Sequence, residues 1–335
     1  MAMAQVRDVA ARAGVSPATV SNALNHPERV SESTRLRVQE AIEDLGYVRN
    51  DAARQLRQRQ NRAVGMIVLD VANPFFADLA QAAEGSLAEL QRPLLLGNSA
   101  QDSSREQTHL RLFEEQRVSG ILISPVATVL NRLRRIKERG TAVVIVDRKS
   151  GADEFSSVSV DDRLGGRLAA EHLIQQGRRR IVVIGGPGTI RQVAHRLAGA
   201  EHAAEEHGDI DVGFHDTGAM DISSGRAATR ELLSRPPGER PDAIFATNDL
   251  VALGVLQELA RAGVSVPDDI ALIGYDDIEF AASATVPISS VRQPAAEMGH
   301  RAADLLVSAI EDPGAAVEHP VFTPSLVARE STLGN

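Results

Sequence analysis

The sequence predicts a small helical domain followed by an α/β core of two doubly wound parallel-sheet subdomains. Residues 5–49 show the spacing of three short helices, and the chain from residue 63 onward alternates short apolar runs with longer amphipathic stretches. Such an alternation is typical of parallel sheets that are covered by helices. The apolar runs form two series, within residues 64–146 and 181–277, and two series indicate two sheets.

The helices of the amino-terminal domain carry recognisable start and stop signals. The first helix, over residues 7–13, is expected to end at Gly14, since glycine favours the turn that closes a helix. Ser16 is expected to cap the second helix and Pro17 to open it. Two helices joined by this tight Gly-Val-Ser turn predict a helix-turn-helix. A third helix is expected after Ser31, with a buried stripe of Val38, Ala41, Ile42 and Leu45.

Residues 50–62 are polar and rich in Arg and Gln, and Leu56 is their only large apolar residue. Two interpretations stand at this point. One is a solvated linker, and the other is a helix of about two turns, capped by Asn50 or Asp51. A helix of this length is marginal by itself, because isolated helices below about 12–15 residues rarely persist in water.

Charge is distributed unevenly along the chain. The formal net charge is −9, yet residues 1–62 hold ten Arg against seven Asp and Glu, a net of +3, so the remainder carries −12. A small basic domain on an acidic body is the pattern expected of a DNA-binding domain fused to another function.

The composition also limits the classes of protein to consider. The absence of cysteine excludes disulfides, thiolate catalysis and cysteine-bound zinc, and it suits a reducing compartment. The sequence shows neither a signal peptide nor an apolar stretch long enough to cross a bilayer. We therefore expect a cytoplasmic protein that makes no contact with a membrane.

The residues that follow the apolar runs are unusually polar. A single carboxylate at a strand end is often only a helix cap, but five strand ends all supply donors, acceptors or aromatic rings. Ligands of doubly wound sheets bind at these ends. Fixed polar groups beside a Phe pair suit a polyhydroxylated ring with one apolar face. The strand-end segments are residues 70–76, Ser124-Pro125, Asp147-Arg148, Asn248-Asp249 and residues 275–277.

An enzyme is not indicated. The sequence GPG at 186–188 lacks the remaining glycines of a dinucleotide-binding fingerprint, and no Walker, GxSxG or HExxH motif is present. The nine His are scattered along the chain. We expect no catalytic residue, no cofactor and no metal site. The rival functions are a sugar-binding transport component and a sugar-processing enzyme.

Short motifs in a fixed order run through the whole chain. They include VRDVAARAGVSPATVSNALN (6–25), ARQLR (53–57), VANPFF (71–76), VSVDDRLGGRLAAEHL (158–173), FATNDLVALG (245–254), IALIGYDD (270–277) and SLVARESTL (325–333). In these motifs and their spacing the sequence resembles the LacI/GalR family of bacterial transcriptional regulators.

The resemblance implies a domain organisation and an assembly. Residues 1–49 would form the helix-turn-helix domain, 50–62 a hinge helix and linker, and 63–335 an effector-binding core. Within the core, subdomain one would comprise about 63–161 and 292–322, and subdomain two about 162–291 and 323–335. A homodimer on a pseudo-palindromic operator of double-stranded DNA is expected, since no heptad helix follows the last motif.

The resemblance also implies the DNA contacts. The second helix would enter the major groove, where Asn22 is able to pair with adenine while proline and alanine offer only apolar contact. Leu56 would insert into the minor groove and kink the DNA. The helix residues carried over are Ser16, Pro17, Ala18, Thr19, Ser21, Asn22 and Asn25.

The ligand site that the resemblance implies is closest to that of ribose-binding members. Ser124 stands where an Asn is common, and Met220 stands near a place usually held by an aromatic ring. The expected function is a repressor of sugar-utilisation genes that a monosaccharide switches, and a purine or nucleoside effector is the alternative. The other ligand residues carried over are Asn73, Phe75, Phe76, Asp147, Arg148, Arg196, Asn248, Asp276 and Gln293.

Overall fold

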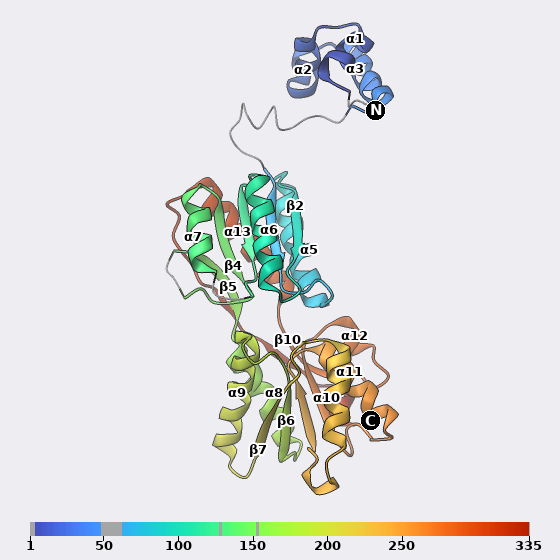
Figure 1. Cartoon of the computed structure of the whole chain (residues 1–335), viewed down its shortest axis with the longest axis vertical. Coiled ribbons are helices and arrows are strands. Elements are labelled where there is room, and N and C mark those ends of the chain that lie inside the picture. The colour runs from blue at the N-terminus through green and yellow to red at the C-terminus, as the bar shows by residue number, and fades with distance from the viewer. Residues whose placement is uncertain (1–3, 48–61, 127–128, 152–153, 335) are drawn as a thin grey trace. The chain divides into compact units, whose positions relative to one another are not determined.

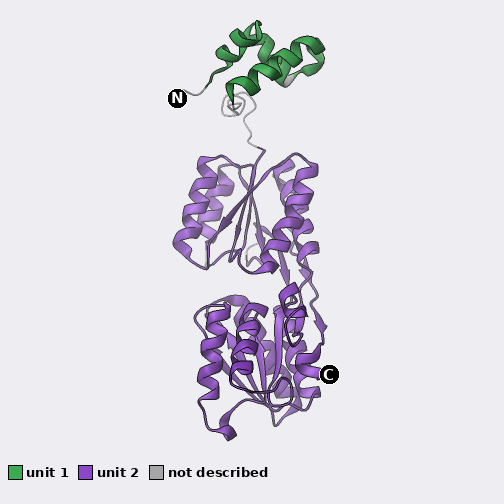
Figure 2. Ribbon diagram, turned by 90° about the vertical axis from the view of Figure 1, so that its right-hand side faces the viewer, with its two compact units in different colours: residues 1–60 green, residues 61–335 purple. Residues whose placement is uncertain are grey.

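The computed structural model describes residues 4–47, 62–126, 129–151 and 154–334. The chain forms two compact units, residues 1–60 and 61–335, which are coloured green and purple in Figure 2. The predicted hinge helix, with Leu56, lies outside the described residues.

The amino-terminal unit contains the three predicted helices. Its elements are α1 (Val6–Ala13), α2 (Pro17–Asn25), the short η1 (Pro27–Arg29) and α3 (Glu32–Leu45). Gly14 and Gly46 end α1 and α3 with φ of 65° and 56°, and Ser16 and Ser31 cap α2 and α3. The helix-turn-helix is thus confirmed.

The core of this unit is small. It consists of Val9, Ala10, Ala13, Val20, Val38 and Ala41. Leu45 was expected in the buried stripe of α3, but 37% of it is exposed. That prediction was wrong because Leu45 lies in the last turn of α3, beyond the six residues of the core.

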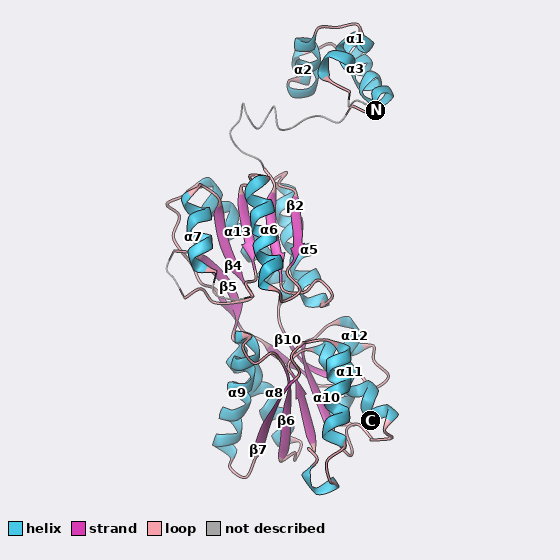
Figure 3. Ribbon diagram, in the orientation of Figure 1, coloured by secondary structure: helices cyan, strands magenta, loops and turns pink. Residues whose placement is uncertain are grey.

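The larger unit begins with a six-stranded sheet, sheet one, in the order β11-β5-β4-β3-β1-β2. Its strands run parallel, and helices cover both of its faces (Figure 3). The strands are β1 (Val64–Val68), β2 (Leu94–Asn98), β3 (Gly120–Ile123), β4 (Ala142–Val146), β5 (Ser156–Val160) and β11 (Val321–Phe322). The helices are α5 (Pro74–Glu89), α6 (Ser103–Glu115), α7 (Leu130–Glu138) and α13 (Ala295–Glu311).

Sheet two has the order β12-β10-β9-β8-β6-β7. Its strands β10, β6 and β7 are labelled in Figure 1. It is parallel except for β12, which pairs antiparallel with β10. Its strands are β6 (Arg180–Gly185), β7 (Asp211–Asp216), β8 (Ala243–Ala246), β9 (Ala271–Asp276), β10 (Ser289–Arg292) and β12 (Ser325–Val327). Its helices are α8 (Asp162–Gln175), α9 (Arg191–His207), α10 (Ile222–Leu233), η2 (Pro237–Glu239), α11 (Asp249–Arg261), α12 (Glu279–Ala282) and α14 (Glu330–Leu333).

The chain passes between the two sheets three times. The passages join β5 to α8, β10 to α13 and β11 to β12. The strand ends that carry the polar segments of the sequence therefore come from both sheets. No helix among the described residues is both long enough and apolar enough to cross a membrane.

Helices α8 and α9 touch through their backbones. A Cβ on Gly166 would lie 1.9 Å from the carbonyl oxygen of Arg196, and a Cβ on Gly199 would lie 2.1 Å from that of Arg163. Any side chain at these two positions would push the helices apart. Glycine therefore fixes the distance between α8 and α9.

The strand β2 departs from the prediction of a buried strand. It lies at the edge of sheet one, and Leu95 and Leu96 are 39% and 51% exposed. An apolar run is buried on both faces only when strands and helices surround it, and an edge strand lacks a neighbour on one side.

Candidate functional site

Residues from both sheets meet around one small cavity. The cavity measures about 30 Å³, which is room for a water molecule or two but not for a sugar. The lining residues are Leu69, Asn73, Phe75, Phe76, Asp147, Ile190, Gln192, Arg196, Met220, Asn248, Asp276 and Gln293.

Nine of the eleven predicted ligand residues line this cavity. Ser124 and Arg148 do not: Ser124 is buried after β3, and Arg148 follows Asp147 with its pKa lowered by burial and by the charge of Arg191. Sequence reasoning did not single out Leu69, Ile190 or Gln192. A signal for Gln192 was available, because it lies four residues before Arg196 on α9 and hence on the same helix face.

Two sets of hydrogen bonds cross the cavity between the subdomains. Asn73 Nδ2, at the start of α5, donates to Asp276 Oδ2 over 2.8 Å. Gln192 Nε2, on α9, donates to the Asp147 carboxylate over 2.7 Å and to its carbonyl oxygen over 2.8 Å. Groups that bond to each other here are also the ones that a ligand between the subdomains would meet.

Two asparagines at the cavity also act as helix caps. Asn73 Oδ1 accepts the Phe75 N–H at the start of α5, and Asn248 Oδ1 accepts the Val251 N–H at the start of α11. The capping bond uses only the oxygen of each amide. The amide nitrogen remains able to donate to another group. The Asn248 nitrogen donates to the Met220 carbonyl over 3.1 Å. Capping therefore fixes the position of each side chain and leaves its amide nitrogen able to bond to another group.

Arg196 is buried and held on three sides. Its Nε donates to Asp162 Oδ1 over 2.8 Å, and its Nη1 donates to the Thr247 carbonyl over 2.6 Å. Its guanidinium stacks 3.6 Å from the centre of the Tyr275 ring. Arg196 also lines the cavity, and its guanidinium carries further N–H groups that are able to donate to a ligand.

The electrostatics of the site are dominated by carboxylates. Asp147, Asp162 and Asp276 are buried near the cation of Arg196, and burial is the main cause that raises the pKa of each. For Asp147, burial and the charge of Asp162 raise the pKa to about 8. Raised pKa values favour the neutral carboxyl, which both donates and accepts hydrogen bonds, so the site suits a neutral ligand that is rich in hydroxyl groups.

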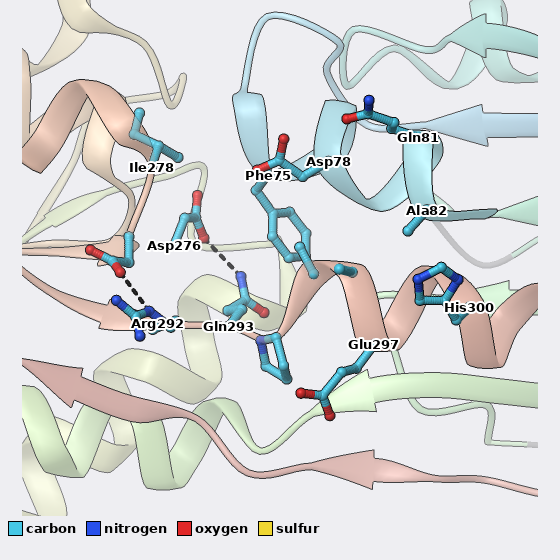
Figure 4. A pocket seen from close by; sticks show the side chains of 14 residues that line it. Phe75, Asp78, Gln81, Ala82, Asp276, Ile278, Arg292, Gln293, Glu297 and His300 are labelled. Atoms are coloured by element: carbon cyan, nitrogen blue, oxygen red, sulfur yellow. Dashed lines mark hydrogen bonds and ion pairs between the residues drawn. The ribbon is translucent and has the colours of Figure 1, made fainter. Parts of the chain in front are cut away.

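Buried polar atoms without a partner point to the same place. Asp147 Oδ1 and Gln293 Oε1, both at the cavity, have no hydrogen-bond partner, although nearly all buried polar atoms in proteins have one. Beside the cavity lies a more open groove of about 500 Å³, which shares Phe75, Asp276 and Gln293 with it (Figure 4). The described residues hold no cluster of three or more His, Cys, Asp or Glu that suits a metal ion.

The raised pKa of Asp147 predicts a pH dependence of stability. The folded protein retains a proton on Asp147 up to about pH 8, whereas the unfolded chain releases it near the ordinary value of 3.8. This contribution to the free energy of unfolding is complete below the unfolded pKa of 3.8 and is fully lost once the pH has risen through the folded pKa of about 8. We expect the Tm to fall between about pH 4 and about pH 8 and the fall to be shallower in Asp147→Asn. Equal slopes in calorimetric scans of the two proteins would contradict this assignment.

The predicted DNA-contacting residues lie on α2. Pro17, Ala18 and Asn22 are exposed, and Val20 between them is buried in the core of the amino-terminal unit. Ser16 is occupied as a cap, since its Oγ accepts the Thr19 N–H over 3.1 Å and lies 2.9 Å from Thr19 Oγ1. Ser21 is half-buried, and the side chain of Asn25, like Leu56, lies outside what the structure describes.

Two family models match the chain. The one for bacterial regulatory proteins of the lacI family matches residues 5–50, and the one for the periplasmic binding protein-like domain matches residues 170–332. The ribose operon repressor of Escherichia coli (strain K12) is 36% identical over 332 residues, which are 98% of this chain and 100% of that protein. The chain belongs to the LacI family.

Solved structures of LacI-family proteins share its fold. The Lac repressor dimer bound to operator and the anti-inducer ONPF has a TM-score of 0.81 at 26% identity, covering 99% of this chain and 100% of that one. A LacI family transcriptional regulator from Enterococcus faecium with bound ribose has a TM-score of 0.74 at 27% identity, covering 82% and 99%. LacI-family proteins are DNA-binding transcriptional regulators, so the expectation of a regulator rather than an enzyme is confirmed.

Proposed function

We propose that this LacI-family regulator is a homodimeric repressor of sugar-utilisation genes, and that a monosaccharide in the cavity switches its affinity for a pseudo-palindromic operator. D-ribose is the first candidate. The observation that carries the proposal is the buried Arg196, a cation in the wall of a cavity that is also lined by carboxylates and amides. Since such a regulator acts on the chromosome, we place it in the cytoplasm.

Two further observations support a sugar. The rings of Phe75 and Phe76 line the cavity with their centres 5.0 Å apart, and such a pair offers an apolar wall to the C–H face of a sugar ring. The ribose operon repressor of Escherichia coli matches 98% of the chain, and one structural neighbour holds ribose.

Thermal-shift measurements on the full chain test the effector. A ligand that binds only the folded state stabilises it by about 2.7 kcal/mol when present at a hundredfold excess over its Kd. We expect D-ribose to raise the Tm and ribose 5-phosphate, an anion, to have no effect. A rise with adenine or a nucleoside, and none with pentoses or hexoses, would replace the sugar by the purine alternative.

Selection from random duplexes tests the operator. We expect an inverted repeat. The affinity of the protein for this DNA should fall steeply as the salt concentration rises, because the basic residues of the amino-terminal unit displace counterions from the phosphates. Enrichment of a direct repeat, or of no sequence, would contradict the dimeric repressor.

The exposed edge of sheet one suggests where the two copies meet. Leu95 and Leu96 on β2, Leu90 after α5 and Leu112 on α6 are all between 39% and 51% exposed. Apolar side chains along an unpaired strand edge mark an interaction surface. We expect Leu96→Glu to yield a monomer in light scattering, while Leu333→Glu, at an exposed leucine of α14, remains dimeric. Two dimeric variants would show that the copies meet elsewhere.

A further inference from the structure

The turn after β9 has a costly backbone conformation. Asp276 and Asp277 are consecutive, neither is glycine, and their φ angles are 104° and 59°. Positive φ at such residues persists only when the surrounding structure holds it. The turn matters because Asp276 accepts hydrogen bonds from Asn73 across the cavity and from Gln293 beside it, the latter over 2.7 Å (Figure 4).

Asp249 is hydrogen-bonded, directly or through one other residue, to the backbone amides of Asp277 and Ile278 in this turn. Asp249 is fully buried, and its Oδ2 accepts the Ile278 N–H over 2.9 Å. Its Oδ1 accepts the hydroxyl of Ser290 over 2.8 Å, and Ser290 Oγ in turn accepts the Asp277 N–H over 3.0 Å. One bond is therefore direct and the other runs through Ser290.

The neighbouring residues are arranged around this carboxylate. A Cβ on Gly274 would lie 2.0 Å from Asp249 Oδ1, so β9 leaves room for the carboxylate only because residue 274 is glycine. Helix capping does not explain Asp249, because Asn248 already caps α11. Arg292 and Arg329, each at 2.6 Å, fix the side chain of Asp277 by ion pairs.

We propose that Asp249 is a positioning residue, which acts through Ser290 and the Ile278 amide to keep the Asp276 carboxylate directed at the effector cavity. The part that concerns the effector rests on the proposed function. The part that concerns the turn stands without it, so the two are tested separately.

Hydrogen exchange of the full-length protein without ligand tests the turn. We expect Ser290→Ala to accelerate exchange at the Asp277 amide and Asp249→Ala to accelerate it at both Asp277 and Ile278, by about tenfold or more. The β9 amides should keep their protection. Ser99→Ala is the matched control, because it removes an equally buried hydroxyl that bonds to the Val68 and Leu69 carbonyls in subdomain one, away from the turn. Unchanged exchange at both turn amides in folded Asp249→Ala overturns the proposal.

A double-mutant cycle tests the link to the effector, with D-ribose as the probe. We expect Ser290→Ala to weaken ribose binding about tenfold in the wild-type background and not at all in the Asp276→Ala background, because no carboxylate is left to position. Equal losses in both backgrounds mean that Ser290 acts independently of Asp276 and overturn the link. If the wild type does not bind ribose, the proposed effector fails, and hydrogen exchange alone decides the role of Asp249.

Discussion

We expect Arg196→Ala to abolish the response to the effector, while the ligand-free variant still binds the operator. The substitution removes a cation that lies within the cavity lining and is held by Asp162 and the Thr247 carbonyl. Hydrogen bonds to charged groups contribute roughly 1.5–3 kcal/mol each, so losing two contacts to a ligand weakens binding by at least about a hundredfold.

Calorimetry with the effector and gel shifts with the operator measure the two halves of this prediction. Arg163→Ala is the matched control, since it makes the same truncation at an exposed position of α8. Arg196→Ala combined with Asp162→Asn removes the carboxylate that the first change leaves unpaired, and this separates lost stability from lost binding. Effector affinity within about twofold of wild type would show that Arg196 is only structural.

Asn22→Ala causes the largest loss of operator affinity that we expect from one substitution. Asn22 is exposed on α2, and a bidentate pair with adenine contributes about 1–3 kcal/mol to base discrimination. A dimer reads two half-sites, so the loss is about 2–6 kcal/mol, or roughly thirtyfold to ten-thousandfold.

The control for this variant is Gln39→Ala, which truncates an exposed amide on α3. Effector affinity of Asn22→Ala should equal that of wild type, since the cavity lies in the other compact unit. If Asn22→Ala and Gln39→Ala have the same operator affinity, Asn22 does not contact the bases.

The sequence predicted those strands of the fold that are apolar throughout. Strands β5 and β10 escaped prediction because they are rich in serine, yet most of their residues are buried. Their hydroxyls are satisfied inside the protein: Ser157 Oγ accepts the Ser150 N–H, and Ser290 Oγ bonds to Asp249. Hydrogen bonding makes such residues compatible with a core, and hydropathy does not detect it.

The site could be predicted where it follows from strand ends. Asn73, Asp147, Asn248 and Asp276 belong to the polar segments that follow the predicted strands, and all four line the cavity. Arg196 sits within a helix, and only the family resemblance indicated it. The roles of Gln192 and Asp249 depend on partners 45 and 29 residues away in the chain, and no local pattern reveals such partners.

The close contact of α8 with α9 has a consequence for biosensor engineering. Because Gly166 and Gly199 leave no space between the helices, the placement of Arg196 depends on backbone rather than on exchangeable side chains. Libraries that seek new effectors should therefore keep both glycines and vary the cavity wall, where Phe76, Ile190 and Met220 come from separate segments. A sensor rebuilt in this way keeps the placement of Arg196 while its ligand selectivity changes.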